Sequence, residues 1–390
     1  MRKILVLLIC LSLTGCKFYD EYEMPKDVYI KLNNKSIDVY DEKKLKDIIK
    51  DTNVKITNKN KVLPTNKIGK QKITINYTYK KRTYKFETSY EVKDEVKPIF
   101  LSASSTRYTK VSEDINLCDN IVYADNYDKK IVCQIDGEYD INTIGKYNLK
   151  YLIKDSSNNE NSEEFVLNVV NEEPDNKYEE YESEKHYFSD IISKYKTDDN
   201  EVGIDVSAWQ GDIDFNKVRE AGCDFVIIRM GYNYKNKLNL DSYYESNIKK
   251  ANESGLKVGV YLYTMAKTKK EAKEQAKFVI KNLKNYKIDF PVAYDFEDWS
   301  NFKDYNLSLH DLYELFKTFN DELNKSNYKA MIYGSKYYLE TAWMNLNKHD
   351  VWLAHYTDET NYEGDYNFWQ MSNTGRINGI DGDVDIDIKK

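Results

Sequence analysis

Two periods of apolar and polar positions divide the chain. Between residues 24 and 170, apolar side chains alternate with polar ones; in 72–92, for example, Ile73 and Ile75 share one face. A period of two is typical of half-buried β-strands. From residue 202 onward, short apolar runs alternate with segments of helical period, which predicts strands separated by helices. The sequence therefore predicts a multidomain protein in which β modules precede an α/β module.

An internal repeat divides the alternating region into two copies. The segment 66–79, NKIGKQKITINYTY, aligns with 142–154, NTIGKYNLKYLIK, in an Asn, an Ile-Gly-Lys turn and an alternating strand. Self-similarity of this kind indicates tandem units, and short strands with frequent turns are typical of β-sandwiches. We expect an anchor and a first β-sandwich over residues 16–95, and a second β-sandwich over 96–171.

The second copy resembles the bacterial Ig-like surface domains. The resemblance lies in DEVKPIF at its start, ADNYDKK in its middle and IGKYNLKYLIKDSSNNENSEEFVLNVV at its end. It implies a spacer or a weak binding module.

A charged stretch precedes the last module. Residues 171–186, NEEPDNKYEEYESEKH, carry seven acids and two lysines with almost no aliphatic side chain. Such a composition buries too little apolar surface to fold by itself and predicts a solvated linker. We place this acidic linker at 172–200, with one helical turn possible near its end, and the last module at 201–390.

Eight apolar runs predict the strands of the last module. Helical patterns separate the first of them; Thr268 and Glu271, for example, form a capping box before an amphipathic stretch. Five strand–helix units followed by three strands predict a barrel of parallel type with an incomplete ring of helices. The runs are 202–207, 224–231, 257–264, 289–297, 329–334, 351–356, 366–371 and 383–388, and the helices are expected at 214–221, 241–254, 268–285, 308–326 and 335–346.

The first residues have the pattern of an export signal. Arg2 and Lys3 precede the apolar stretch Ile4–Leu13, which is too short for a comfortable membrane span. The letters LTGC that follow resemble the bacterial lipobox, whose cysteine is acylated and becomes the new N-terminus. The resemblance implies a signal peptide over 1–15, a lipid anchor on Cys16 and a location on the outer face of a bacterial membrane, in the cell-wall zone.

Three cysteines would remain beside the anchor after such cleavage. Cys118 and Cys133 lie in strand-like segments of the second β module, where an oxidising compartment permits a disulfide. The sequence leaves open whether they pair, because a disulfide requires matched geometry. Cys223 precedes a buried strand and is expected to be a small core residue.

Carboxylates gather at the predicted ends of the barrel strands. Asp295 and Glu297, in PVAYDFEDW, share one face of a strand with Cα atoms roughly 7 Å apart, while Tyr294 faces the helices. Asp205 ends the first run, and Asp385 lies in the eighth, its neighbour in a closed barrel. The carboxyl ends of barrel strands carry chemistry, and clustered carboxylates repel until one takes up a proton. A proton donor beside anions is what glycosidic cleavage requires.

Residues 202–390 resemble the lysozymes of glycoside hydrolase family 25, which are muramidases. The resemblance implies a (β/α)5β3 TIM-like barrel that hydrolyses the β-1,4 bond between N-acetylmuramic acid and N-acetylglucosamine in peptidoglycan, without a cofactor or metal. By motif it implies Glu297 as general acid and Asp295 as its partner, and it implies Asp205 and Asp385 as flanking acids. The matching stretches are GIDVSAWQGDIDFNKV, VGVYLYT, FPVAYDFE, MIYGSKYYLE, VWLAHY and FWQMSNTGRINGIDGDVDID.

Two positions depart from the family pattern. Leu262 stands between the tyrosines of YxY, where members often have His or another polar or aromatic residue. Asp387 stands where an Asn commonly follows the eighth-strand Asp; together with Asp383 it is either a neighbour of the site or a solvated carboxylate. These departures bear on subsite contacts and local pKa values rather than on the reaction class. Retention with help from the substrate's N-acetyl group and inversion by an activated water both stay open.

Aromatic residues near the strand ends are candidates for sugar stacking. Core packing is the alternative for each of them. The residues expected to bind substrate are Tyr261, Tyr263, Tyr356, Trp369 and, in the loop after Asp205, Trp209.

Composition and motifs argue against several other classes. The net charge is −7 with both signs interspersed, and no basic patch indicates nucleic-acid binding. The four histidines form no HExxH, so a zinc peptidase or amidase is not indicated, and the DxDxE run of a chitinase-like barrel is absent. The remaining alternative is a non-catalytic glycan-binding surface protein. We expect a monomeric muramidase whose β modules and linker hold the barrel towards the wall.

Overall fold

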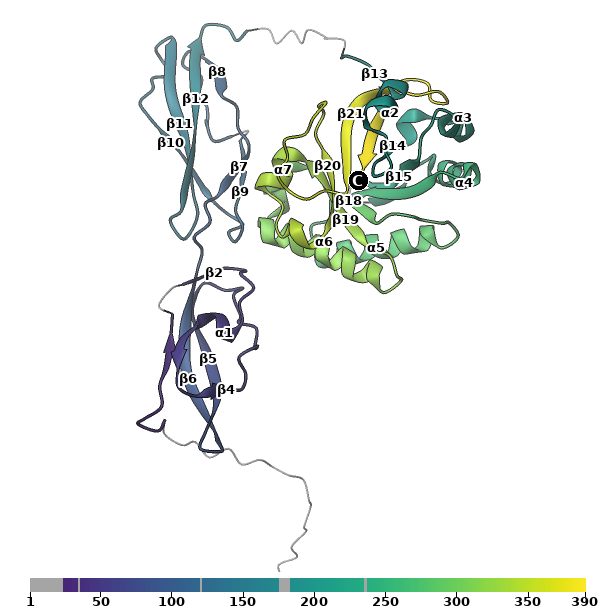
Figure 1. The fold of residues 1–390 in the computed structure, drawn as a ribbon. Coiled ribbons are helices and arrows are strands. Elements are labelled where there is room, and N and C mark those ends of the chain that lie inside the picture. Colours follow the sequence, from purple (N-terminus) through teal and green to yellow (C-terminus); the bar gives the residue numbers. More distant parts are fainter. Residues whose placement is uncertain (1–23, 34–35, 120, 175–182, 235–236) are drawn as a thin grey trace, which may run out of the picture. The chain divides into compact units, whose positions relative to one another are not determined.

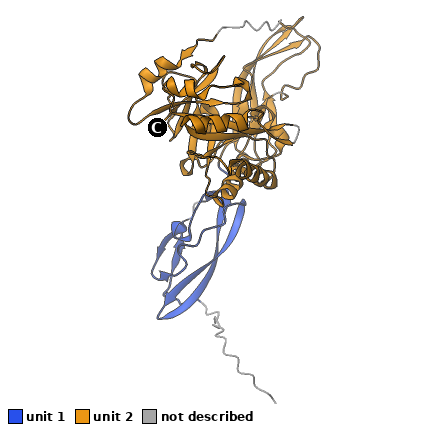
Figure 2. Ribbon diagram, turned by 90° about the vertical axis from the view of Figure 1, so that its right-hand side faces the viewer, with its two compact units in different colours: residues 1–95 blue, residues 96–390 orange. Residues whose placement is uncertain are grey.

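The computed structural model describes residues 24–33, 36–119, 121–174, 183–234 and 237–390. These residues form two compact units, residues 1–95 and residues 96–390 (Figure 2). The predicted signal peptide and Cys16 lie outside the described residues. No helix within the described ranges is long and apolar enough to cross a bilayer.

The first unit is built around one long hairpin. β5 (Gly69–Tyr79) and β6 (Arg82–Lys93) pair antiparallel along their lengths, and Lys80 and Lys81 form the two-residue turn with φ angles of 46° and 65°. Alternate residues of β5 are buried, as the period of two predicts. The other elements are β1 (Ile30–Leu32), β2 (Ile37–Asp38), α1 (Leu45–Ile48), β3 (Ile49–Thr52) and β4 (Lys55–Ile56).

The second β module, residues 96–171, contains two sheets that share one core. The rings of Tyr151 and Phe165 stack at 3.9 Å inside it, together with Phe100 from the smaller sheet. Cys118 and Cys133 form a disulfide with their Cα atoms 6.1 Å apart, which settles the pairing that the sequence left open. The sheets are β10-β11-β12-β8 and β7-β9, built from β7 (Ile99–Ser102), β8 (Thr106–Lys110), β9 (Val122–Ala124), β10 (Val132–Asp136), β11 (Gly145–Lys154) and β12 (Glu160–Val170).

Folded elements occupy part of the segment predicted as a linker. β13 (His186–Tyr187) pairs in parallel with the sheet of the C-terminal module, and α2 (Phe188–Tyr195) follows it. Phe188 and Ile191 of α2 are buried in the core of that module, because they lie on one face of the helix. The structured part of the chain therefore resumes before residue 201.

Eight strands of the C-terminal module, residues 201–390, form a sheet that closes on itself (Figure 1). Seven of them run parallel to their neighbours in chain order. The last strand pairs with both the first and the seventh and completes the ring. The strands are β14 (Glu201–Val206), β15 (Phe225–Tyr234), β17 (Lys257–Tyr263), β18 (Val292–Asp295), β19 (Ala330–Ser335), β20 (Asp350–Ala354), β21 (Phe368–Arg376) and β22 (Val384–Lys389).

Helices connect the first strands and surround the sheet (Figure 1). All five predicted helices are present, and α5 begins with the predicted capping box of Thr268 and Glu271. β16 (Lys237–Leu240), which the sequence pattern did not predict, forms a hairpin with the end of β15. The helical elements are η1 (Ala208–Gln210), α3 (Phe215–Glu220), α4 (Tyr244–Ser254), α5 (Lys269–Leu283), η2 (Trp299–Tyr305), α6 (Leu309–Asn324), α7 (Lys336–Thr341) and η3 (Leu346–Lys348).

The orientation of the last strand differs from the expected all-parallel sheet. β22 runs antiparallel to β14 and to β21. Only residues 377–383 connect β21 to β22, and a parallel crossover needs a dozen or more residues. The short connection therefore forces a hairpin. As a consequence, the start of β22 lies beside the end of β14.

The two faces of the closed sheet bury different sets of side chains. Ala293 of β18 lies in the small core inside the ring, whereas Tyr294 and Phe296 lie in the large core between sheet and helices. Successive side chains of a strand point to opposite faces. The prediction that Tyr294 faces the helices is therefore confirmed, and Asp295 points into the ring.

The second β module packs against the C-terminal module. Leu101, Val122 and Ala124 belong to the same buried cluster as Trp299 and Phe302 of η2, and β9 contacts η2. If the second β module were only a spacer held away from the C-terminal module, these apolar side chains would be exposed to solvent.

Polar contacts complete the same interface at the start of α6. The amide N–H groups of Leu309 and His310 donate to the carbonyl oxygens of Asp125 and Asn126 at 2.8 and 3.3 Å. The first N–H groups of a helix lack acceptors within the helix. Here the carbonyl oxygens of the loop after β9 serve as the acceptors. Lys129 also forms an ion pair with Asp311 of α6 at 2.9 Å.

This interface predicts that Val122→Asp destabilises the C-terminal module. Val122 is buried, so its replacement places an unpaired charge in the shared core and should cost about 2–4 kcal/mol. All five tryptophans of the chain lie beyond residue 200. Urea unfolding of the full chain, followed by tryptophan fluorescence, therefore reports on the C-terminal module alone.

Val132→Asp is the matched control, because Val132 is exposed on the same β module. An unchanged tryptophan transition in Val122→Asp would mean that the two modules unfold independently.

Candidate active site

Four carboxylates meet at one end of the closed sheet. Asp295 is the last residue of β18, and Glu297 follows two residues later. Asp205 lies near the end of β14 and pairs directly with Asp385 at the start of β22. The antiparallel direction of β22 is what brings Asp385 to this end. The structure thus brings together the four acids that the sequence singled out as catalytic.

Asp295 and Glu297 lie in different environments. Asp295 is buried, and its Oδ1 has no hydrogen-bond partner among the described residues. Burial and the nearby charge of Glu297 raise the pKa of Asp295 well above its usual range, and Arg229 partly opposes the shift. Glu297 reaches solvent, yet the surrounding protein raises its pKa as well. The surroundings therefore disfavour simultaneous ionisation of both members of this pair.

Asp205 and Asp385 are also held in a protein-rich environment. Burial, with the added charges of Glu297 and Asp383, raises the pKa of Asp385 to about 6. Burial and the charges of Asp385 and Asp387 raise the pKa of Asp205 well above its usual value. The mouth of the sheet therefore disfavours full ionisation of its acids.

Gln370 of β21 links the acids to two tyrosines. Its Nε2 donates to Asp205 Oδ2 at 2.7 Å. The hydroxyl groups of Tyr333 and Tyr356 donate to its Oε1 at 2.8 and 3.2 Å. These contacts fix the orientation of the amide, since its oxygen already accepts two hydrogen bonds. The sequence interpretation missed Gln370, although it lies on the same face of β21 as Phe368, which lines the interior.

Arg229 is a second residue that the sequence interpretation missed. Its Nε forms an ion pair with the buried carboxylate of Asp241 at 2.7 Å, and Asp241 also accepts the N–H of Ala208 at 3.1 Å. Phe225 and Ile227 of β15 line the interior, so the period of two would have directed Arg229 inward too. A basic residue in an otherwise apolar strand was therefore the sequence feature that could have identified Arg229 as part of the site.

Three of the five predicted substrate-binding aromatics, Tyr261, Tyr263 and Tyr356, lie close to the acids. Tyr261 lies inside the ring with an edge-on contact to Trp352, and Tyr263 lies two residues further along the same strand. Tyr356 donates to Gln370 and is 53% exposed, whereas Trp209 of η1 is 84% exposed. Exposed aromatic rings are suited to stacking on sugars.

The structure does not place Trp369 among these residues. Trp369 lies on the outer face of β21, buried beneath α2, where its ring meets Tyr195 edge-on at 5.9 Å. Its Nε1 donates to the carbonyl oxygen of His355. Because side chains alternate along a strand, Gln370 rather than Trp369 faces the acids.

Two further acids on either side of Asp385 in the chain lie in different environments. Asp383 forms ion pairs with Lys185 and Arg376 at the surface. Asp387, by contrast, is completely buried next to Asp205.

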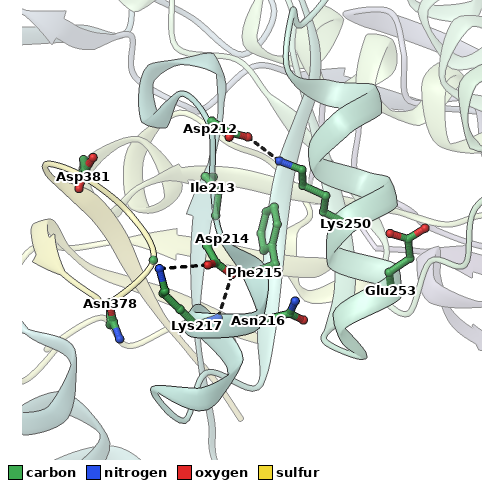
Figure 3. Close-up of a pocket in the computed structure, with 11 residues that line it drawn as sticks. Asp212, Ile213, Asp214, Phe215, Asn216, Lys217, Lys250, Glu253, Asn378 and Asp381 are labelled. Carbon is green, nitrogen blue, oxygen red and sulfur yellow. Dashed lines mark hydrogen bonds and ion pairs between the residues drawn. The ribbon is translucent and has the colours of Figure 1, made fainter.

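A surface cavity of about 630 Å³ lies away from the acids (Figure 3). It lies between α3, α4 and the connection from β21 to β22. Its charged side chains are largely paired: Lys250 with Asp212, and Lys217 with Asp214 (Figure 3). None of the four mouth carboxylates lines it, so we assign the chemistry to the mouth and not to this cavity.

The chain matches the family model described as glycosyl hydrolases family 25 over residues 204–380. It is 27% identical over 189 residues to the autolytic lysozyme of Clostridium acetobutylicum, covering 47% of this chain and 54% of that protein. It is 30% identical over 193 residues to the uncharacterized protein YegX of Escherichia coli K12, covering 48% of this chain and 68% of that protein. The chain thus spans about half the length of the first relative and two thirds of the second.

Solved structures give similar matches over part of the chain. The modular autolysin LytC of Streptococcus pneumoniae, in complex with a synthetic peptidoglycan ligand, matches with a TM-score of 0.45 and 25% identity, over 62% of this chain and 56% of that chain. A family 25 glycosyl hydrolase from Bacillus anthracis matches with a TM-score of 0.44 and 23% identity, over 50% of this chain and 92% of that chain.

The raised pKa of Asp295 predicts how Asp295→Asn changes stability with pH. The unfolded carboxyl ionises near pH 4, but the folded one keeps its proton to higher pH. The wild type therefore loses stability as the pH rises from about 4 towards the folded pKa, and the amide does not. The difference in Tm between Asp295→Asn and wild type should increase between about pH 4 and pH 8.

Asp304→Asn, which removes an exposed carboxylate from η2, is the control for a general charge effect. A Tm difference for Asp295→Asn that stays constant with pH would contradict the raised pKa.

Proposed function

The chain belongs to family 25 of the glycosyl hydrolases, and on this basis we propose that it hydrolyses the glycan strands of peptidoglycan. We interpret the C-terminal module as a (β/α)5β3 TIM-like barrel whose mouth is the active site. The bond that we assign to it is the β-1,4 bond between N-acetylmuramic acid and N-acetylglucosamine. The supporting observation is the group of four acids with raised pKa values at the carboxyl end of β14 and β18.

Glu297 is the proposed general acid. Glu297 is exposed at the mouth, and burial by the surrounding protein raises the pKa of its carboxyl group, which favours the protonated form that a general acid needs. Proton transfer to the glycosidic oxygen lets the bond to the leaving sugar break. Positive charge then develops at the anomeric carbon, and the anions among Asp295, Asp205 and Asp385 stabilise it. A water molecule completes the hydrolysis, with either stereochemical outcome.

The aromatic residues around the mouth are the proposed sugar contacts. Trp209, which follows Asp205 in the chain, and Tyr356 offer exposed rings. Tyr261 lies deeper, inside the ring, and Tyr263 is two residues further along β17. The exposed rings suit stacking against the apolar faces of sugar units.

The proposed site of action is outside the cytoplasm, on the outer face of a bacterial membrane. The LTGC motif supports acylation of Cys16, and the Cys118–Cys133 disulfide agrees with an oxidising compartment. The first β module, residues 16–95, is the proposed spacer. The second β module is not assigned this role, because it shares a core with η2.

The assignment predicts that Glu297→Gln abolishes cleavage. The amide cannot donate the proton, so turnover should fall by about two to four orders of magnitude, while wall binding persists. The measurement uses the full chain with purified peptidoglycan and identifies the sugar at each new reducing end. Reducing muramic acid ends are expected from the wild type, and Glu363→Gln, an exposed glutamate, serves as control.

Reducing glucosamine ends would overturn the assigned bond and keep the acid. If neither protein releases ends and both bind the wall, the chain is a non-catalytic glycan-binding protein instead.

The anchor predicts that Cys16→Ser moves the protein from the membrane fraction to the soluble fraction. An acyl chain binds membranes by burying CH₂ groups at about 0.8 kcal/mol each, and serine accepts no such anchor by this route. Incorporation of a labelled fatty acid in growing cells is the direct measurement. Cys10→Ser is the matched control, since Cys10 would leave with the signal peptide. Label on the Cys16→Ser protein would contradict the lipobox interpretation.

A further inference from the structure

Asp387 of β22 is a buried carboxyl group beneath the mouth of the sheet. Its side chain is completely buried, and its Oδ1 accepts a hydrogen bond from Trp352 Nε1 at 2.8 Å. Its Oδ2 has no partner among the described residues. A buried carboxylate oxygen without a hydrogen bond is costly, so this atom requires an explanation.

Strand register brings Asp387 next to Asp205. Asp387 lies opposite Gly203 in the β14–β22 pair and is therefore diagonal to Asp205 on the interior face. The two buried carboxyl groups are therefore neighbours on this face, and the charge of Asp387 contributes to raising the pKa of Asp205. Gly203 leaves no space for a third side chain there, because a methyl group at this position would meet the Phe225 ring at 2.5 Å.

Each of the two acids has one separate donor. Asp205 Oδ2 accepts from Gln370 Nε2, and Asp387 Oδ1 accepts from Trp352 Nε1. Neither acid forms an ion pair with a lysine, arginine or histidine in the described ranges. Two adjacent carboxylates without a counter-cation repel, whereas one proton between them turns the repulsion into a hydrogen bond.

We propose that Asp205 and Asp387 share one proton, and that Asp387 is a positioning residue that holds Asp205 and limits the pair to one negative charge. The shared proton supplies the missing partner of Asp387 Oδ2. Gln370 and Trp352 then hold the outer oxygens of the pair from opposite sides.

The electrostatic surroundings agree with this arrangement. Burial raises the pKa of both acids, and their neighbouring charges add to the shift. The titratable groups near the pair are Asp385 on β22, three tyrosines and the buried thiol of Cys223; the tyrosines are Tyr261, Tyr333 and Tyr356. All of them are acids, so none supplies a positive charge in place of the proton.

The catalytic consequence rests on the proposed function. A pair with a single charge stabilises an oxocarbenium-like transition state without the desolvation cost of two buried anions. A held Asp205 also keeps Gln370, and through it Tyr333 and Tyr356, in fixed positions at the mouth.

Infrared difference spectroscopy of the full chain tests the proton without a substrate. Asp387→Asn keeps a donor for Asp205 and an acceptor for Trp352, but it removes the acid. Compared with wild type near neutral pH, it should lose the C=O stretching band of one protonated carboxyl group. Asp383→Asn is the matched control, because Asp383 is a paired surface carboxylate of the same segment, and it should lose no such band. An unchanged band in Asp387→Asn would overturn the proposal.

Kinetics then separate positioning from folding. Asp387→Asn should retain kcat/KM within about threefold, whereas Asp387→Leu, of similar size, should lose at least about tenfold through loss of a hydrogen bond to a charged group. Thermal unfolding checks that both variants fold. Equal losses in two folded variants would overturn the positioning role. Failure of the Glu297→Gln experiment would overturn the proposed function alone, since the infrared result does not depend on catalysis.

Discussion

Closure of the sheet by an antiparallel last strand is the constraint on which the site depends. β22 fits between β14 and β21 because it pairs with both, and its direction places its first residues at the mouth. Asp385 and Asp387 therefore meet Asp205 from β14 and Gln370 from β21 in one place. A parallel eighth strand would present the opposite end at this position. The short connection between β21 and β22 thus determines which acids lie at the same end of the sheet.

The second constraint is electrostatic. The mouth gathers carboxylates in a protein-rich environment, where each ionised group raises the cost of the next. Arg229 opposes this effect at Asp295, but its own charge is already engaged by Asp241. The surroundings therefore favour the protonated forms of these acids, and a protonated carboxyl group is what general acid catalysis requires. At these positions, the burial that raises the pKa values also lowers the stability of the fold.

The second β module bears on the same site from outside. η2 follows Glu297 by two residues, and its apolar side chains share a core with β7 and β9. The backbone after the proposed acid is thus held between two modules. In this respect the second β module is part of the structure around the site, and the first unit, residues 1–95, is the separate body.

The sequence by itself determined the elements and their faces. Apolar runs located all eight strands of the closed sheet, and a period of two correctly separated Asp295 from Tyr294, because periodicity is a local property. Motifs also brought Glu297, Asp205 and Asp385 into one group. Only the tertiary structure decided the direction of β22, the burial of Trp369 under α2, the Cys118–Cys133 disulfide and the contacts of Gln370, Arg229 and Asp387. These depend on which strands are neighbours, and strand pairing joins residues far apart in the chain, such as Asp205 and Gln370, that no local pattern relates.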